Sequence, residues 1–463
     1  MTPALEIAAE VRCGRRTTRS FADQAVTAIR ASNRRYDAVT RLLEQRAFAE
    51  ADLVDTQIAA GRDPGPLAGV PYCVKDLFDV EGLPTTAGAA LRDAAPPACS
   101  DAKAIRLLRD AGAVLIATAN MDEFAYGFAT INAHYGTTRN PHDITRLAGG
   151  SSGGSAAVVA AGIVPLSLGS DTNGSIRVPA SLTGIYGLKP THDALPMDGV
   201  FPFVASFDDI GPFATSVADL RLAWEVLRGG PAPASGETPK VARLGGWFRD
   251  GVDPDLLADI DRIADAVGGA PLVELPDVTR ARSAAFLMTA AEGGALHLPV
   301  LRDKAMAYDP ATRDRLLAGA MLPASAYLRA REFRSWFLDR ALDLFARYDV
   351  LICPATPCIA PTIDDPMIEI GGKSVPARAH LGILTQPLSF IGLPVLSAPL
   401  LRPGKMPLGI QIVGAPGAEH RLFDFAARLE RMGLIGTSPP PAHEPAATNL
   451  QTWDDHHDRG NPQ

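Results

Sequence analysis

Two serine-bearing glycine turns, separated by a run of small apolar residues, dominate the segment from Leu147 to Pro190. The segment reads LAGGSSGGSAAVVAAGIVPLSLGSDTNGSIRVPASLTGIYGLKP, and Ser151 and Ser175 stand 24 residues apart in it. The Ala/Val run between them has helical length, and a short strand-like run follows it. Glycines let the backbone adopt positive φ and approach a ligand closely. A serine on such a turn can present its hydroxyl beside free backbone N–H groups, as a nucleophile with an oxyanion hole requires.

Taken alone, the first Gly/Ser cluster is also compatible with an ordinary turn at the start of a helix. A phosphate-binding loop fits less well, because no Gly-Lys-Ser/Thr ending follows and no G-x-G-x-x-G opens the helix. A third element, GVPYCVKD at residues 69–76, lies upstream, and Lys75 ends its apolar, strand-like run. A solvated surface lysine is the common alternative, but a lysine that closes a buried run is less usual.

Together the three elements resemble the amidase signature family, which carries a GGSSGG loop, a D-x-x-G-S-I-R-x-P turn and a lysine in a G-x-P-x-x-x-K-D context. By this resemblance Lys75 matches the catalytic lysine, Ser151 the bridging serine and Ser175 the nucleophile. The resemblance implies that neutral Lys75 accepts a proton from Ser151, which takes one from Ser175. Burial can lower a lysine pKa by several units, so a neutral lysine is chemically reasonable. The resemblance also implies a cis peptide bond between Gly150 and Ser151.

The same resemblance assigns the oxyanion hole to the backbone N–H groups of Thr172, Asn173, Gly174 and the nucleophile. Most glutamine-dependent members read D-T-G-G-S here, so Asn173 replaces their first glycine. The N–H is kept, and the added side chain is expected to narrow or polarise the pocket. Asp171 and Arg177 are expected to pair across the turn as a structural brace.

A further stretch, NMDEFAYG at residues 120–127, is similar to a family loop that lines the acyl pocket. Simple packing of Met121 and Phe124 in the core is the alternative, and the sequence favours neither.

Substrate binding is suggested by the pattern Tyr327-x-x-Ala330-x-x-x-Arg334. It resembles the stretch in amidotransferase A subunits whose arginine binds the substrate carboxylate, and a guanidinium can bind a carboxylate bidentately. A surface arginine on a helix is the alternative for Arg334, and Arg302 is a second candidate. Those subunits also bind the α-ammonium group through an aspartate, where this chain has Gly382. The pattern therefore favours a small acidic amide without an α-amino group.

Two passages, at residues 171–213 and 289–302, are most similar to the branch of the family that hydrolyses 1-carboxybiuret in the breakdown of s-triazines. This resemblance implies a small acidic ureido substrate, an acyl-enzyme and release of ammonia, without a cofactor. It also implies a homodimer and a small helical partner subunit. The alternatives are a glutamine-hydrolysing A subunit of a tRNA-dependent amidotransferase, a general aliphatic or aryl amidase, and a non-catalytic binding or scaffold protein. The intact set of Lys75, Ser151 and Ser175 argues against the last.

Composition narrows the classes of protein that remain. The 463 residues are 47% apolar and 21% charged, as in soluble globular proteins, and the net charge of −8 with a pI near 5.6 disfavours nucleic-acid binding. We see no N-terminal apolar leader and no uncharged apolar run of 18 residues, so we expect a cytoplasmic protein without a membrane span. Five scattered cysteines without C-x-x-C, and nine histidines without H-E-x-x-H, indicate neither a disulfide framework nor a metal site.

Helix-like and strand-like patterns alternate along the chain and predict an α/β fold. Residues 1–60 are predicted to be helical, with Val26, Ile29, Val39 and Leu42 at helical spacing. The family resemblance implies a large mixed β-sheet flanked by helices on both faces. We expect a single domain over residues 1–437, with a helical N-terminal part over about 1–65, a mostly helical subregion over about 240–345, and a disordered tail over 438–463.

Overall fold

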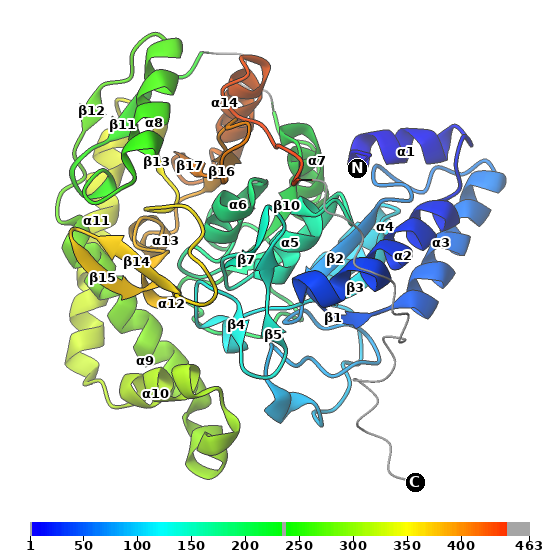
Figure 1. Cartoon of the computed structure of the whole chain (residues 1–463), viewed down its shortest axis with the longest axis horizontal. Helices are drawn as coiled ribbons and strands as arrows, with labels where there is room; N and C mark the ends of the chain where they lie inside the picture. The colour runs from blue at the N-terminus through cyan, green and yellow to red at the C-terminus, as the bar shows by residue number, and fades with distance from the viewer. Residues whose placement is uncertain (1, 234–237, 442–463) are drawn as a thin grey trace.

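A mixed β-sheet forms the centre of the molecule in the computed structural model, which describes residues 2–233 and 238–441 (Figure 1). Within those residues the sheet has 11 strands in the order β1-β3-β2-β8-β10-β9-β16-β17-β13-β11-β12. The strands are β1 (Val39–Leu42), β2 (Pro71–Lys75), β3 (Val114–Ala119), β8 (Leu166–Asp171), β9 (Tyr186–Lys189), β10 (Asp209–Ala214), β11 (Val241–Leu244), β12 (Leu272–Val273), β13 (Val350–Pro354), β16 (Val395–Pro399) and β17 (Gly409–Val413). The predicted α/β fold with a large mixed sheet is thereby confirmed.

Short two-stranded ladders lie outside this sheet. They are β4 (Ile131–Asn132) with β5 (Gly136–Thr137), β6 (Arg139–Asn140) with β7 (Asp143–Leu147), and β14 (Met367–Ile370) with β15 (Lys373–Pro376).

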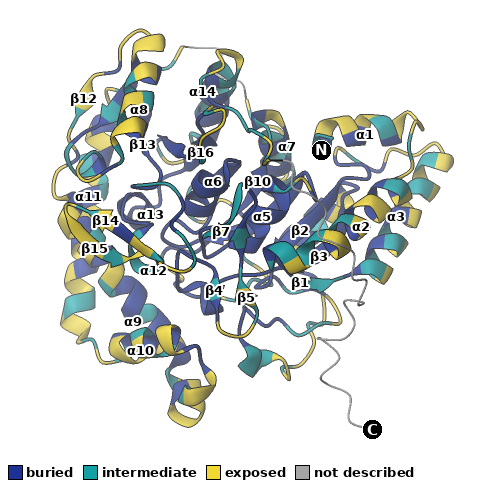
Figure 2. Cartoon of the chain, viewed as in Figure 1, coloured by how far each residue is buried: buried dark blue, intermediate teal, exposed yellow. Residues whose placement is uncertain are grey.

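Helices cover both faces of the sheet. In the described residues they are α1 (Ala4–Arg12), α2 (Thr18–Tyr36), α3 (Glu44–Ala59), α4 (Lys103–Asp110), α5 (Gly153–Ala160), α6 (Arg177–Thr183), α7 (Val217–Arg228), α8 (Pro254–Ala266), α9 (Val278–Lys304), α10 (Pro310–Ala320), α11 (Ala324–Phe345), α12 (Ala377–His380), α13 (Gln386–Phe390) and α14 (Glu419–Arg431). Successive strand residues point to opposite faces. Tyr72 and Val74 of β2 join the apolar cluster under α4, α7 and α14, whereas Cys73 joins the one under α2, α5 and α6. Figure 2 shows the resulting buried interior and the exposed outer sides of the peripheral helices.

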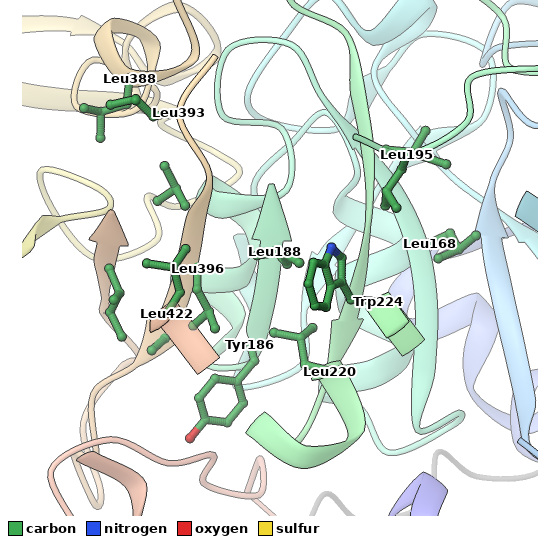
Figure 3. Packing of buried hydrophobic residues seen from close by; sticks show 14 of the residues in the cluster. Leu168, Tyr186, Leu188, Leu195, Leu220, Trp224, Leu388, Leu393, Leu396 and Leu422 are labelled. Carbon is green, nitrogen blue, oxygen red and sulfur yellow. The ribbon is translucent and has the colours of Figure 1, made fainter. Parts of the chain in front are cut away.

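Helix α7 illustrates how the sequence directs this packing. Ser216 caps its N-terminus by accepting a hydrogen bond from the Asp219 N–H (3.1 Å), and Gly229 ends it in the left-handed conformation with φ of 85°. Leu220 and Trp224 lie one turn apart on its buried face. Figure 3 shows both side chains beside Leu188 of β9, so the helix is held on the sheet by its apolar stripe.

Lys75 and the second Gly/Ser turn are brought together by two parallel strands. Strand β2 pairs in parallel with β8, with Tyr72 opposite Leu166 and Val74 opposite Leu168. Because parallel strands end at the same edge of a sheet, Lys75 at the end of β2 lies near the turn that follows β8. Helix α5, which starts just after Ser151, is buried at all of its residues and packs on the same strands.

The N-terminal region contains a strand where the sequence predicted only helices. Residues 39–42 form β1, which pairs antiparallel with β3 and is the edge strand of the sheet, with Val39 opposite Ala119. Helix α2 ends before it, at Asp37, whose φ of 47° is left-handed. The apolar spacing that suggested a helix is overridden because the open edge of β3 offers backbone hydrogen-bond partners.

Helix α9, together with the short turn that follows it, is long and apolar enough to cross a membrane. Over Val278–Ala307 its best window has a mean hydropathy of 1.3, but half of that window is buried inside the protein. The helix packs against α10 and α11 and bears buried residues along its length, which is typical of a core helix in a soluble protein.

The proposed division of the chain stays a prediction. Residues 240–345 carry α8 to α11 together with the short strands β11 and β12. Most of the expected tail, residues 442–463, lies outside the described part of the chain.

Candidate active site

Lys75 and Ser151 meet in the interior, at the carboxyl edge of the sheet. Lys75 Nζ lies 2.7 Å from Ser151 Oγ and 2.8 Å from the Oγ of Ser170 in β8, and none of these side chains is more than 4% exposed. The peptide bond between Gly150 and Ser151 is cis. Two hydroxyl groups therefore hold the amine in place, and no described carboxylate forms an ion pair with it.

Burial lowers the pKa of Lys75 to about 7, although the carboxylates of Asp122, Asp208 and Asp171 act in the opposite direction. Removing the ammonium group from water disfavours its charged form more than these carboxylates favour it. An amine with this pKa is substantially neutral near pH 7 and can accept a proton from a hydroxyl group.

Ser175 follows β8 and lines a narrow cavity of about 20 Å³. Its hydroxyl makes no hydrogen bond with any residue that the structure describes, and its backbone oxygen accepts from the Ser152 N–H (3.3 Å), which joins the two serine loops. The cavity is lined by Ala125, Tyr126, Gly127, Phe128, Thr172, Asn173, Ser175, Phe203, Phe286, Thr289, Arg315 and Gln386. It has room for about one water molecule, so an amide enters only if side chains at its rim move.

The backbone of the Ser175 turn supplies free N–H groups. Those of Thr172, Asn173 and Ser175 donate to no residue in the described part of the chain, whereas the Gly174 N–H donates to Asp171 Oδ1 (2.6 Å). Of the expected oxyanion-hole donors, Gly174 is thus already engaged. The three remaining N–H groups next to the cavity are the donors available to an oxyanion.

Asp171 and Arg177 brace this turn, as the sequence predicted. Their side chains form an ion pair at 2.9 Å, and both are fully buried. Asp171 also accepts from the N–H of Gly174 and of Ile176 (3.2 Å). Burial alone would raise the pKa of Asp171, but the Arg177 guanidinium outweighs it and holds that pKa below its ordinary value. The carboxylate therefore shapes the backbone beside Ser175.

Two carboxamide side chains face the cavity with unpartnered oxygens. Asn173 donates from Nδ2 to Thr289 Oγ1 (2.9 Å), while its buried Oδ1 has no hydrogen-bond partner among the described residues. Gln386, at the start of α13, likewise has a buried Oε1 without a partner there. Asn173 thus contributes its side chain to the pocket wall, as expected from the sequence.

Arg315 of α10 is the arginine among the described lining residues. It donates from Nη1 to the backbone oxygen of Tyr126 (3.0 Å), and its guanidinium lies 3.6 Å above the centre of the Tyr126 ring. Sequence reasoning missed this residue, because it stands in no recognisable motif.

The two arginines expected from the sequence lie elsewhere. Arg334 of α11 donates to the Ser206 backbone oxygen (2.9 Å) and lines a separate cavity of about 570 Å³, which shares no described lining residue with the Ser175 cavity. Arg302, near the end of α9, is exposed. The structure does not bring either side chain into the wall of the pocket that holds Ser175.

The 120–127 stretch combines both of the roles left open by its sequence. Phe124 packs against the rings of His297, at 4.3 Å between centroids, and Tyr308, at 5.4 Å. The residues directly after it, from Ala125 to Phe128, line the cavity. One half of the loop therefore anchors it in the core while the other half forms the pocket wall.

Gly382 lies against the pocket residue Phe128. A side chain at this position would overlap with the Phe128 ring, because a Cβ built on Gly382 falls within the contact distance of its Cζ and Cε atoms. An aspartate at this position would have no space while Phe128 keeps its place.

Within the described ranges, no group of three or more His, Cys, Asp or Glu side chains is arranged to hold a metal ion.

A comparison with protein families accounts for the arrangement. The family model described as Amidase matches residues 21–423. The chain belongs to the amidase signature family. As a member of this family it is a hydrolase, and its fold is the amidase signature fold.

Two relatives illustrate the range of similarity within the amidase signature family. Over 451 residues the chain is 47% identical to AtzE of the 1-carboxybiuret hydrolase from Pseudomonas sp. (strain ADP), covering 93% of this chain and 98% of that protein. It is 33% identical to the A subunit of the glutamyl-tRNA(Gln) amidotransferase from Symbiobacterium thermophilum, over 89% of this chain and 93% of that one.

Solved structures agree with the family assignment. An s-triazine catabolic enzyme, studied in a vestigial protein complex, matches at a TM-score of 0.91 and 44% identity, over 94% of this chain and 100% of that one. A bacterial aryl acylamidase of the amidase signature family matches at 0.82 and 27% identity, over 93% and 96%.

Proposed function

We propose that this amidase hydrolyses a C–N bond of 1-carboxybiuret, a small acidic ureido compound, and releases ammonia. The observation that carries the proposal is the buried contact between Lys75 Nζ and Ser151 Oγ, close to a pocket lined by Ser175, in a chain 47% identical to a protein of a 1-carboxybiuret hydrolase. An amine, two hydroxyl groups and free backbone N–H groups are the parts that amide hydrolysis needs.

In the proposed mechanism Ser175 Oγ attacks the terminal amide carbon of the substrate. Ser151 takes the Ser175 proton while passing its own to neutral Lys75, and the backbone N–H groups of Thr172, Asn173 and Ser175 bind the developing oxyanion. Return of the proton through Ser151 to the leaving nitrogen releases ammonia and leaves an acyl-enzyme on Ser175. A water molecule, deprotonated through Ser151 and Lys75, then attacks the acyl-enzyme. This step releases a carboxylate product and restores the Ser175 hydroxyl.

The amidotransferase alternative is less well supported. Gly382 stands where those subunits bind the substrate ammonium, and Phe128 fills the space beside it. The net charge of −8 also offers tRNA little electrostatic attraction.

A partner and a location form part of the same proposal. We infer homodimerisation, a small helical partner subunit, and a cytoplasmic setting, as the resemblance to 1-carboxybiuret hydrolases implies. Support comes from the matching relative, whose structure was studied in a protein complex. Light scattering on the protein, alone and co-expressed with a small gene product encoded beside it, would measure both kinds of association.

Ammonia release from a substrate panel tests the proposed function. The purified protein, with and without a co-encoded partner, is given 1-carboxybiuret, allophanate, biuret, malonamide, glutamine and a neutral aryl amide. We expect release from 1-carboxybiuret that is absent in Ser175→Ala. Release from glutamine alone would overturn the substrate assignment, and preference for the aryl amide would favour a general amidase.

A further inference from the structure

The Ser175 pocket contains a guanidinium that forms no ion pair with a described carboxylate, although the charge of Asp122 acts on it from a distance. Arg315 pairs with no described carboxylate, and its polar contacts all go to Tyr126. The neighbouring Arg378, by contrast, lies 3.4 Å from Asp309 and 3.8 Å from Asp122. A guanidinium stays charged at all ordinary pH values, so Arg315 holds an unpaired cation beside the nucleophile.

The same pocket also contains hydrogen-bond acceptors that nothing satisfies. Asn173 Oδ1 and Gln386 Oε1 are buried without partners among the described residues, and both side chains are at most 6% exposed. Unpaired buried polar atoms cost free energy, and sites that recognise a polar ligand commonly bear this cost until the ligand binds. Thr289 and the Asn173 amide hold one of these acceptors in place through their 2.9 Å hydrogen bond.

We propose that Arg315 is the residue that binds the substrate carboxylate, while Asn173 and Gln386 accept hydrogen bonds from the N–H groups of its ureido backbone. This inference rests on the proposed function, because it assumes that the amide is cleaved at Ser175. Such a pocket selects compounds with a carboxylate at one end, N–H groups in the middle and a terminal amide at the other.

The arrangement accounts for selection in both directions. A carboxylate gains a charge-assisted, bidentate contact with Arg315, whose plane is held by stacking on the Tyr126 ring. An ammonium-bearing amide such as glutamine brings a second positive charge into the same small pocket and is repelled. A substrate with methylene groups in place of N–H groups leaves the Asn173 and Gln386 oxygens unpaired.

Paired substrates separate the contribution of Arg315 from general catalysis. The variants Arg315→Gln and Arg315→Lys are assayed on two pairs of substrates, 1-carboxybiuret with biuret and malonamate with malonamide. In each pair only the first compound carries a carboxylate. We expect Arg315→Gln to lower kcat/KM about 100-fold for the carboxylated member, mainly through KM, and less than about threefold for the neutral one. For the carboxylated substrates, the kcat/KM of Arg315→Lys is expected to lie between those of the wild type and Arg315→Gln, because lysine keeps the charge but lacks the planar guanidinium.

A matched control and a competing residue are available. Arg313→Gln, on the same helix but bonded to Asp314, is expected to leave all four rates unchanged. An equal loss on both members of a pair in Arg315→Gln would overturn the inference, as would a selective loss in Arg334→Gln without one in Arg315→Gln. Thermal unfolding of each variant shows whether a loss of activity on all substrates comes from misfolding. If Arg315→Gln is misfolded, the selectivity of Arg315→Lys for carboxylated substrates tests the inference instead.

A binding measurement tests the same contact without the carboxylated substrate. Malonate is used as a competitive inhibitor of malonamide hydrolysis, and its inhibition constant is expected to rise about 100-fold in Arg315→Gln. An unchanged constant would overturn the inference. If the wild type fails to hydrolyse 1-carboxybiuret yet prefers malonamate through Arg315, the proposed substrate is wrong while this inference stands.

The carboxamides are tested by Asn173→Gly, which keeps the backbone N–H and removes the side chain. We expect about a tenfold loss on allophanate and little change on malonamate, which has a methylene group where allophanate has N–H. Equal effects on the two substrates would show that Asn173 does not accept from the ureido backbone.

Discussion

Lys75 Nζ and Ser151 Oγ lie 2.7 Å apart, and neither side chain is exposed to solvent. A second hydroxyl, from Ser170, holds the amine from strand β8. Burial lowers the pKa of Lys75 to about 7, so in the proposed mechanism its neutral amine is the acceptor for the Ser151 proton.

Substitution of the three proposed catalytic residues should remove turnover to different degrees. We expect Ser175→Ala to abolish it and Lys75→Ala nearly to do so, because the nucleophile and its base have no substitutes. Ser151→Ala should lower kcat by about 10³-fold or more, because the proton path is broken. Ammonia release in single-turnover assays measures each loss, with circular dichroism as the control for folding. Near-normal turnover in Ser175→Ala or Lys75→Ala would contradict the mechanism.

The pH dependence of activity should follow Lys75. Its neutral form is the proposed base, so kcat/KM is expected to rise through a pKa of about 7 and to level off above it. The profile should be the same for carboxylated and neutral substrates, since the base is common to both. A profile that falls between pH 6 and 8 would exclude a neutral lysine as the base.

Stability should depend on the same group. The folded pKa of Lys75, about 7, lies below the ordinary value of 10.5, so between these values the unfolded chain binds more protons than the folded one. The free energy of unfolding contributed by Lys75 therefore rises with pH across this window. Urea unfolding of the wild type and Lys75→Met at pH 7 and 10 should show the variant losing relative stability as the pH increases. A pH-independent difference would contradict the lowered pKa.

Breaking the Asp171–Arg177 pair should destabilise the fold and the oxyanion turn together. Arg177→Met leaves a fully buried carboxylate unpaired, which typically costs about 3–5 kcal/mol. Chemical unfolding measures this loss. The double variant Asp171→Asn with Arg177→Met should lose less stability than the sum of the two single variants. Each single variant leaves the other member of the pair buried without its partner, and the double variant does not. A cost below about 1 kcal/mol in Arg177→Met would show that the brace is unimportant.

Adding a side chain at Gly382 should be tolerated only if Phe128 is reduced. Gly382→Ala forces a methyl group onto the Phe128 ring, and overpacking of this kind costs about 1–3 kcal/mol. In the Phe128→Ala background the same substitution should cost much less. Thermal and urea unfolding of the wild type, the two single variants and the double variant measure the coupling free energy between the two positions. Equal costs in both backgrounds would show that Phe128 does not restrict this position.

The sequence alone was enough to nominate the candidate catalytic residues, because they stand in local patterns. Lys75 ends an apolar, strand-like run, Ser151 and Ser175 stand in glycine-rich turns at a fixed spacing, and the α/β pattern follows from the periodicity of the chain. The pairing of Asp171 with Arg177 was also predictable, because the two residues stand on the same short turn.

Tertiary structure decided what depends on residues far apart in the chain. Strand β1 forms because β3 offers it a free edge, which no local spacing reveals. Arg315 reaches the pocket because α10 packs on α9, although it stands 140 residues after Ser175, whereas Arg334 lies on another cavity. A sequence motif reflects interactions between residues that are close in the chain. The packing of whole helices, by contrast, determines which of the helix arginines faces Ser175.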